Sequence, residues 1–259
     1  MALGDQPLPG TKGRQLGEIF LPYFVELGGL TPDEAVLEPG CGTGRMAEPL
    51  SGYLTTGSYD GFDVVREAIE QCEATIMQPN FRFRHVDVLN RFYNPEGRIQ
   101  PDEFQFPYPD ESFDFVFLTS VFTHMLPPEV QHYLNEIRRV LRPDGRCLAT
   151  FFVLNKESLT AARATGGGLP SPSSPALPEL GRKLFPHEGD GYRYNAPNLA
   201  PEAGVGYREQ KVREFLGEAG FELQVLRYGT WSGRQDASVF NQDIVVVKRP
   251  PTRGSEATG

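Results

Sequence analysis

Residues 35–45, which read Ala-Val-Leu-Glu-Pro-Gly-Cys-Gly-Thr-Gly-Arg, decide the fold of this chain. Three apolar residues lead to the acidic Glu38, and glycines then alternate with small residues at positions 40, 42 and 44. This pattern predicts a buried strand, a tight turn and the start of a helix. Glycine permits positive φ and lets a ligand approach the backbone, so the turn is a candidate binding site. The same spacing also opens dinucleotide-binding folds, so the glycines alone do not identify the ligand.

Strands and helices alternate along the chain after this turn. Because 113–118 is nearly all apolar, we expect it to be a central parallel strand. The last two predicted strands, 221–228 and 244–248, have no helix between them, so the last strand should be antiparallel. This alternation predicts an α/β fold with a seven-stranded mixed sheet and helices on both faces. The other strands are predicted at 58–63, 81–87 and 146–153, and the helices at 45–53, 65–76, 127–141 and 212–219.

Two segments flank or interrupt this pattern. Apolar residues recur at helical spacing from 15 to 27, and Pro22 predicts a break into two short helices. Residues 154–206 are rich in Gly, Pro and Ser, and a coil of this length is typical of a lid, which here lies between the fifth and sixth strands. We therefore expect one domain over 1–259, divided into a helical start (1–34), a ligand-binding core (35–153), a lid (154–206), a last helix and strand pair (207–249) and a flexible tail (250–259).

The composition excludes several classes of partner. A formal charge of −9 and the lack of a basic run argue against nucleic acid. The chain has no apolar run of the roughly 18 residues that a membrane helix needs, and its start does not resemble a signal peptide. Its three cysteines lack the spacing of metal ligands or of a disulfide framework. We expect a reduced, cytoplasmic protein, a monomer or homodimer, with no bound metal and no membrane partner.

Acidic and small polar residues follow the predicted parallel strands, at the edge of the sheet where ligands bind. Asp63 ends the second strand, 23 positions beyond Gly40, which suits a carboxylate that binds ribose hydroxyls. Asp87 ends the third strand, although a residue there also commonly caps the next helix. Thr119 and Ser120 follow the fourth strand. The sequence therefore predicts a nucleoside-binding site at this edge.

The order of these motifs resembles that of the class I S-adenosylmethionine-dependent methyltransferases, a Rossmann-like family, from about residue 35 to 152 and in the last two strands. The sequence Leu-Arg-Pro-Asp-Gly at 141–145 is similar to the family's usual Leu-Lys/Arg-Pro-Gly-Gly connection, with Asp144 in place of the first glycine. A nicotinamide-dependent oxidoreductase is the competing interpretation, but its glycines are typically spaced G-x-G-x-x-G. An acid before the turn, Glu38, also suits an ammonium group better than a pyrophosphate.

The resemblance implies a set of residues that bind S-adenosylmethionine. Glu38 and the backbone of Gly40 and Gly42 would hold its amino-acid end, and Asp63 its ribose. Further contacts would come from the rest of the turn (Cys41, Gly44), from Asp87 and the Val88 backbone at the adenine amino group, from Val64 and Phe122 on the adenine ring, and from Thr119 and Ser120 under the methionine portion.

The sequence gives less specific signals for the residues that bind the methyl acceptor than for those that bind the cofactor. His124, after the fourth strand, is a candidate general base, and His187 in the lid is a second candidate; a structural role for either remains open. Four aromatic residues could line an apolar acceptor pocket, namely Tyr192, Tyr194, Tyr207 and Trp231, and three arginines could meet an acidic group on the acceptor, namely Arg193, Arg208 and Arg234.

Segments of the chain, 119–124 and 228–234 among them, resemble bacterial methyltransferases of glycan or secondary-metabolite pathways. The resemblance thus implies O-methyl transfer to a hydroxyl of a metabolite or sugar. N-methyl transfer to a small amine or a protein, and a non-catalytic relative that only binds the cofactor, remain alternatives.

Overall fold

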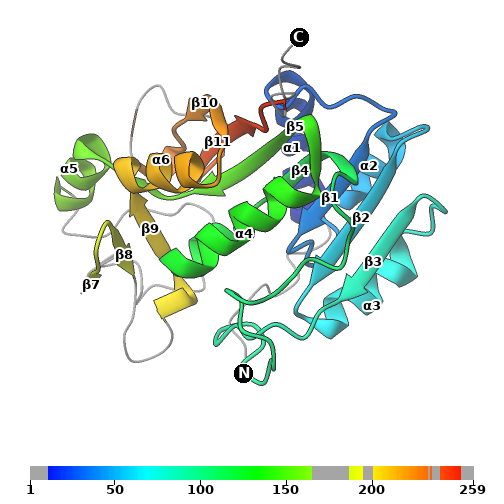
Figure 1. Ribbon diagram of the computed structural model, residues 1–259, viewed down its shortest axis with the longest axis horizontal. Helices are drawn as coiled ribbons and strands as arrows, with labels where there is room; N and C mark the ends of the chain where they lie inside the picture. Colours follow the sequence, from blue (N-terminus) through cyan, green and yellow to red (C-terminus); the bar gives the residue numbers. More distant parts are fainter. Residues whose placement is uncertain (1–10, 165–186, 195–200, 233, 235–239, 252–259) are drawn as a thin grey trace, which may run out of the picture.

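A seven-stranded sheet forms the centre of the computed structural model, which describes residues 11–164, 187–194, 201–232, 234 and 240–251 (Figure 1). The strand order is β10-β11-β5-β4-β1-β2-β3. Neighbouring strands from β3 to β5 are parallel, whereas β11 is antiparallel to both β5 and β10. This confirms the predicted mixed sheet. The strands are β1 (Ala35–Pro39), β2 (Ser58–Asp63), β3 (Phe81–His85), β4 (Phe113–Leu118), β5 (Leu141–Phe151), β10 (Glu222–Arg227) and β11 (Asp243–Lys248).

Helices cover both faces of the sheet (Figure 1). One apolar cluster joins the sheet to α4 (Pro127–Val140) and α6 (Glu209–Glu218). A second cluster joins the opposite face to α1 (Thr11–Glu26) and α2 (Ala47–Tyr53). The central strand β4 contributes to both clusters, and the last four of its residues are fully buried. Burial of each such side chain stabilises the fold by roughly 1.5–3 kcal/mol, which explains the apolar run at 113–118. The remaining helix of the core is α3 (Arg66–Thr75).

The prediction of a break at Pro22 is wrong, because α1 continues through it. Proline removes one backbone hydrogen bond from a helix interior. Pro22 is exposed, so water can reach the backbone carbonyl that loses its partner. Phe20 and Phe24, on the opposite side of the helix, are fully buried in the core. Tertiary packing thus holds one helix where the local sequence favours two.

The predicted turn at 142–145 lies inside β5, which begins at Leu141. Asp144 occupies the left-handed region with φ of 65°, a conformation that aspartate tolerates better than most residues. Its backbone N–H donates to Arg249, 3.1 Å away, and its carboxylate lies 2.8 Å from the Lys248 ammonium. The aspartate therefore fills the family's glycine position without disrupting the chain.

The described part of the predicted lid forms a second, four-stranded sheet with the order β6-β9-β8-β7. The sequence predicts coil over 154–206, but β6 pairs with β9, and this pairing anchors the insert beside β5. The elements are β6 (Val153–Leu154), α5 (Lys156–Ala164), β7 (His187–Glu188), β8 (Tyr192–Tyr194) and β9 (Val205–Arg208), with the short helices η1 (Phe122–His124), η3 (Pro201–Ala203) and η4 (Thr230–Ser232). The rest of the lid (165–186, 195–200) and most of the predicted tail (252–259) lie outside the described residues.

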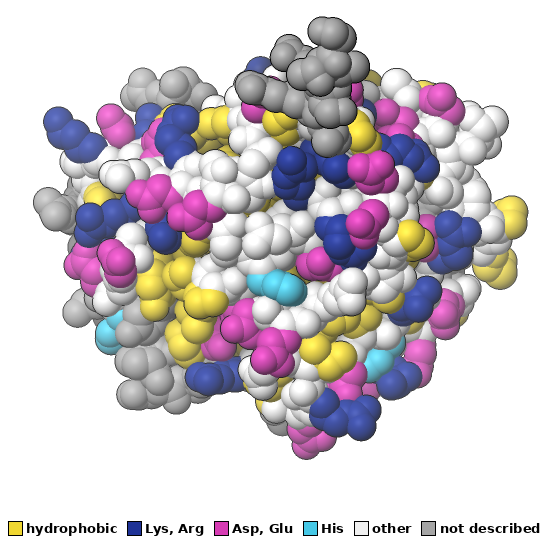
Figure 2. Space-filling view, viewed as in Figure 1, with side chains coloured by type: hydrophobic (Ala, Val, Ile, Leu, Met, Phe, Trp, Pro, Cys, Tyr) yellow, Lys and Arg dark blue, Asp and Glu magenta, His cyan; other side chains and the backbone are white. Residues whose placement is uncertain are grey.

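The surface in Figure 2 carries Lys and Arg side chains interspersed with Asp and Glu, without a continuous basic area among the residues drawn in colour. None of the described helices is long and apolar enough to cross a membrane. The predicted cytoplasmic location and oligomeric state stay predictions.

Candidate active site

A cavity of about 490 Å³ opens at the carboxyl edge of the parallel strands. Its walls come from the turn after β1, the ends of β2 and β4, and the segment that follows β3. The helices η1 and η3 and the first turns of α4 complete it. The cavity therefore lies where the sequence predicts a ligand, and its volume suits a small molecule.

The glycine turn is held against β2 by backbone hydrogen bonds. The N–H groups of Gly40 and Cys41 both donate to the Phe62 carbonyl, at 2.7 and 3.1 Å. Gly42 lines the cavity with φ of 51°, and a Cβ atom on it would meet no protein atom within 4 Å. A Cβ on Gly40 would instead approach Val121 to 2.5 Å. Glycine is needed at position 40 for packing, and at 42 for backbone conformation beside open space.

Asp63 joins the turn to the end of β2. Its Oδ2 accepts a hydrogen bond from the Gly42 N–H at 2.7 Å, and its Oδ1 accepts one from the Val65 N–H at 2.9 Å. The carboxylate lines the cavity although the residue is only 9% exposed. Burial raises the pKa of Asp63, and the N–H donors partly offset that rise. Val64 and Val88 also line the cavity, as predicted.

Glu38 lies behind the glycine turn rather than on the cavity wall. It is 1% exposed, and its carboxylate accepts a hydrogen bond from the Tyr59 hydroxyl. Burial raises the pKa of Glu38 well above its usual range. In this geometry Glu38 links the end of β1 to β2 through Tyr59 and does not line the cavity.

Four other predicted contacts also lie outside the cavity wall. The Asp87 carboxylate forms an ion pair with Arg98, which lowers the pKa of Asp87. Phe122 is fully buried, with its ring centroid 5.0 Å from that of Phe151. Cys41 is buried as well, at 4% exposure, so its side chain belongs to the core. Gly44 packs on the far side of the turn, against α3, where a Cβ would come within 2.9 Å of Ile76.

The end of β4 carries a chain of hydrogen bonds that the sequence did not reveal. Thr119 and Ser120 line the cavity as predicted, and Ser120 has φ of 64°. The Ser120 N–H donates to Thr150 Oγ1 at 2.8 Å, and its Oγ accepts from Gln242 Nε2 at 2.9 Å. Thr150 donates in turn to Gln242 Oε1 at 2.6 Å. Gln242 also lines the cavity, but it lies 122 positions after Ser120, and no local motif marks it.

His124 lies on the cavity wall at the end of η1. Its Nδ1 is 2.8 Å from the backbone carbonyl of Glu202, and its Nε2 is 3.4 Å from the Tyr93 hydroxyl. Because a carbonyl oxygen only accepts, Nδ1 carries a proton, and in the neutral tautomer Nε2 is the acceptor nitrogen that faces the Tyr93 hydroxyl. The imidazole is therefore oriented for proton transfer at Nε2.

Two glutamates complete this end of the cavity, and sequence reasoning missed both. Glu129 Oε2 accepts a hydrogen bond from the Leu126 N–H at 2.6 Å, at the start of α4. Burial, together with the nearby Glu202 and Asp102, raises the pKa of Glu129 to about 7. Glu202 is 5% exposed, and its Oε2 has no hydrogen-bond partner. Acids at single positions outside any motif gave no sequence signal.

The aromatic residues predicted to bind the acceptor do not line the cavity. Tyr207 is fully buried and donates to the Met125 carbonyl at 2.5 Å, and the buried Trp231 donates to Asp243 at 2.7 Å. Tyr192 packs against the core. The structure therefore does not bring these three side chains to the cavity wall; the side chain of Tyr194 lies outside the described residues.

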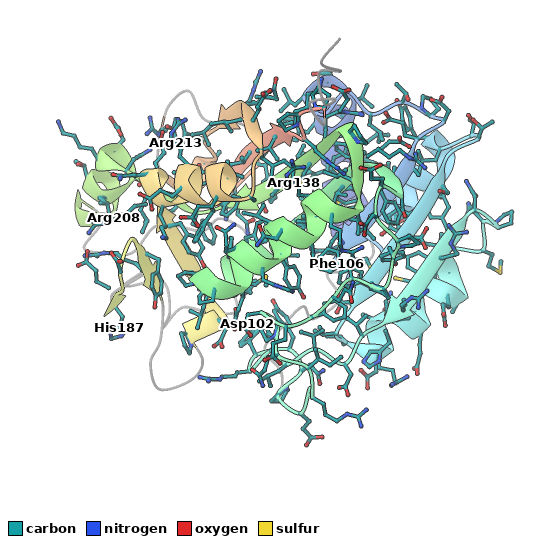
Figure 3. All side chains as sticks on the ribbon, in the orientation of Figure 1. Asp102, Phe106, Arg138, His187, Arg208 and Arg213 are labelled. Atoms are coloured by element: carbon teal, nitrogen blue, oxygen red, sulfur yellow. The ribbon has the colours of Figure 1, made fainter. Side chains whose placement is uncertain are left out.

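The other residues predicted to contact the acceptor or its proton also lie away from the cavity wall. His187 is on β7, at the outer edge of the small sheet (Figure 3). Arg193 and Arg208 both form ion pairs with Glu188. Arg234 forms an ion pair with Glu157. In this geometry His124, and not His187, is the histidine beside the cavity.

Comparisons with known proteins identify the family of this chain. A family model described as a methyltransferase domain matches residues 37–149. The chain is 33% identical over 222 residues to the 27-O-demethylrifamycin SV methyltransferase of Amycolatopsis mediterranei, which covers 80% of this chain and 76% of that protein. The fold is also shared with the crystal structure of a SAM-dependent methyltransferase from Methanosarcina mazei, with a TM-score of 0.57, 17% identity and coverage of 88% of this chain and 98% of that one.

A shorter match links the chain to phthiotriol/phenolphthiotriol dimycocerosates methyltransferase 1 of Mycobacterium ulcerans. Identity is 34% over 126 residues, which is 49% of this chain and 39% of that protein. The chain thus spans well under two thirds of the length of this relative.

Proposed function

Since this chain belongs to the class I S-adenosylmethionine-dependent methyltransferases, we propose that it transfers a methyl group to a hydroxyl of a small-molecule acceptor. The observation that carries the proposal is a single cavity whose wall holds both a nucleoside-type site and an oriented imidazole. We call the part of the wall formed by Asp63 and Gly42 its first end, and the part around His124 its second end.

The residues at the first end fit S-adenosylmethionine. The Asp63 carboxylate is suited to two ribose hydroxyls, and the open space beside Gly42 lets the cofactor lie against the backbone. Val64, Val88 and Thr119 also line the cavity; the two valines would supply apolar surface for the adenine ring, and Thr119 would meet the methionine portion. The bound cofactor supplies an electrophilic methyl group, so the protein has only to align the acceptor and remove its proton.

Proton removal is assigned to His124. The Glu202 carbonyl holds the Nδ1 proton, so Nε2 is the nitrogen that would accept a proton from the acceptor hydroxyl, in place of its contact with the Tyr93 hydroxyl. The planar contact with Phe92, whose ring centroid lies 6.1 Å away at an interplanar angle of 7°, restricts rotation of the imidazole. Both contacts act to keep the base in one orientation while the acceptor binds.

Two observations support a small molecule as the acceptor. The relatives described above carry names of small-molecule and lipid acceptors. The cavity volume of about 490 Å³ is in the range of small-molecule sites, and η3 contributes Glu202 to its wall. Both observations favour a free metabolite.

Isothermal titration calorimetry with S-adenosylhomocysteine, followed by transfer of a labelled methyl group to a panel of hydroxylated metabolites, tests the proposal. We expect binding of one S-adenosylhomocysteine per chain with a Kd on the order of micromolar, and no binding of NADH. Absence of S-adenosylhomocysteine binding, or labelling of proteins only, would contradict it.

A further inference from the structure

The carboxylate of Glu202 is the least satisfied polar group on the cavity wall. The side chain is 6% exposed, and Oε2 is buried without a hydrogen-bond partner. Its Oε1 lies 3.8 Å from Arg91 Nε, but the Arg91 side chain is 63% exposed, so water weakens this pair. An unpaired buried carboxylate oxygen destabilises the protein unless a positive charge beside the carboxylate compensates for it.

A second carboxylate faces the same end of the cavity. Glu129 also lines the wall, and it interacts electrostatically with Glu202 and with Asp102. Asp102 lies beside the N-terminal end of α4 (Figure 3). No lysine or arginine is among the described residues that line this end; Arg45 is on the wall near the glycine turn. Arg91 acts on both carboxylates, but it is one exposed cation beside three acidic groups, so this end of the cavity has an excess of negative charge.

We propose that this end of the cavity binds a protonated amino group on the acceptor, with Glu202 and Glu129 as its carboxylate partners. The inference rests on the proposed function, because it assumes that the acceptor occupies the cavity beyond the cofactor. An ammonium has three N–H donors and a positive charge, so it can pair with the Glu202 carboxylate, whose Oε2 is sealed from the cavity, and offset the charge of Glu129. A hydroxyl supplies one donor and no charge, which leaves the excess negative charge in place.

A metal ion fits this site less well than an ammonium. The described residues contain no group of three or more His, Cys, Asp or Glu side chains placed to hold a metal. One oxygen of Glu129 is already occupied by the Leu126 N–H, which lies 2.6 Å away. A hard divalent cation takes about six oxygen ligands, whereas an ammonium needs only the acceptors already present.

The test compares amine and hydroxyl versions of one small molecule on the full chain saturated with S-adenosylhomocysteine. The probes are trans-4-aminocyclohexanol and trans-1,4-cyclohexanediol, and glucosamine and glucose form a second pair. Dissociation constants come from ligand-observed NMR titrations at pH 7. We expect each amine to bind at least about tenfold more tightly than its hydroxyl counterpart, as for a desolvated charge pair.

The variant Glu202→Gln should remove this preference, because an amide keeps the shape and loses the charge. Glu103→Gln is the matched control, since Glu103 is an exposed acid next to Asp102 and outside the cavity wall. It should retain the full preference for the amine. Should Glu202→Gln fail to fold, Glu129→Gln replaces it, with the same loss of preference expected.

Three outcomes overturn the proposal: equal affinity for amine and hydroxyl probes, binding of neither, or a preference that survives in the Gln variants. A fourth outcome would also overturn the proposal, by assigning Glu202 to a different ligand. If Glu202→Gln weakens binding of S-adenosylmethionine but not of S-adenosylhomocysteine, the carboxylate serves the sulfonium and not an acceptor amine. Intact S-adenosylhomocysteine binding in any of these cases leaves the proposed methyltransferase function standing, so the two failures are distinguishable.

Discussion

The two ends of the cavity are built in different ways. At the cofactor end, Asp63 is held by the backbone N–H groups of Gly42 and Val65, so the site is fixed before any ligand arrives. At the acceptor end, side chains from η1, α4 and η3 converge, and one Glu202 oxygen is left without a partner. The first arrangement suits a single ligand such as the cofactor, whereas the second has a buried carboxylate that we propose the acceptor pairs with. Different chemistry at the two ends predicts different effects of substitution.

Substitution of His124 should have the largest effect and should act on turnover alone. We expect His124→Gln to lower kcat at least roughly a hundredfold, because the side chain no longer accepts the acceptor's proton. Affinity for S-adenosylhomocysteine should change less than about twofold, since the cofactor contacts lie at the other end. His132→Gln is the control, because His132 also bonds a carbonyl, that of Phe104 at 2.9 Å, but outside the cavity wall. Single-turnover methyl transfer measures the first effect and calorimetry the second; a variant with full turnover would make His124 structural.

Asp63→Asn, in contrast, should act mainly on cofactor affinity. An amide cannot accept from both backbone N–H groups and the ribose as a carboxylate does, so cofactor affinity should fall by roughly 10- to 100-fold. Asp60→Asn is the control in the same strand, because Asp60 is buried and pairs with Arg82 at 2.7 Å outside the cavity wall. Calorimetry with S-adenosylhomocysteine, on variants shown to be folded by circular dichroism, separates the two. Equal losses in both variants would mean that the effect comes from β2 and not from the ribose site.

The sequence predicted the cofactor end better than the acceptor end, for a physical reason. The turn at 40–44 and Asp63 each follow a strand directly, so strand order alone brings them to one edge. Gln242 and Glu202 reach the cavity only through the pairing of β11 with β5 and the packing of η3 against His124. These are tertiary contacts between residues far apart in the chain, which no local motif encodes.

The aromatic residues predicted to bind the acceptor show the opposite problem, because the sequence predicted contacts that the structure does not place on the cavity wall. Binding pockets are often lined by aromatic residues, so aromatic residues near a Pro- and Gly-rich segment predict a pocket. Composition alone, however, does not show in which direction a side chain points. Tyr207 alternates inward from β9 and is fully buried against Phe215, with ring centroids 5.4 Å apart. The small sheet itself, which sets that direction, depends on pairing between β6 and β9.

The acceptor end should also reveal itself in the pH dependence of stability. The pKa of Glu129 is raised from 4.5 to about 7 in the folded protein, so the folded state holds this proton more tightly than the unfolded chain. The stabilisation of the fold that comes from this proton is therefore fully present below pH 4.5 and is lost as the pH rises to about 7. Glu129→Gln should raise the free energy of unfolding at pH 8 by about 2 kcal/mol relative to wild type, and by almost nothing at pH 4.5. Urea unfolding at both pH values measures this; an equal change at both would exclude charge as the cause.

The cofactor end should respond mainly through its backbone. Gly42→Ala places a Cβ on a residue with φ of 51°, at a cost of about 1 kcal/mol in unfolding free energy, although no protein atom is close enough to clash. Gly52→Ala is the control: Gly52 is exposed in α2, has equally open space around it, and does not have positive φ, so it should be neutral or slightly stabilising. Because only position 42 borders the cavity, Gly42→Ala should also weaken S-adenosylhomocysteine binding several-fold, by about 1 kcal/mol. Unchanged binding with reduced stability would mean that the cofactor does not lie against the backbone at position 42, and the fixed end of the cavity would then be defined by Asp63 alone.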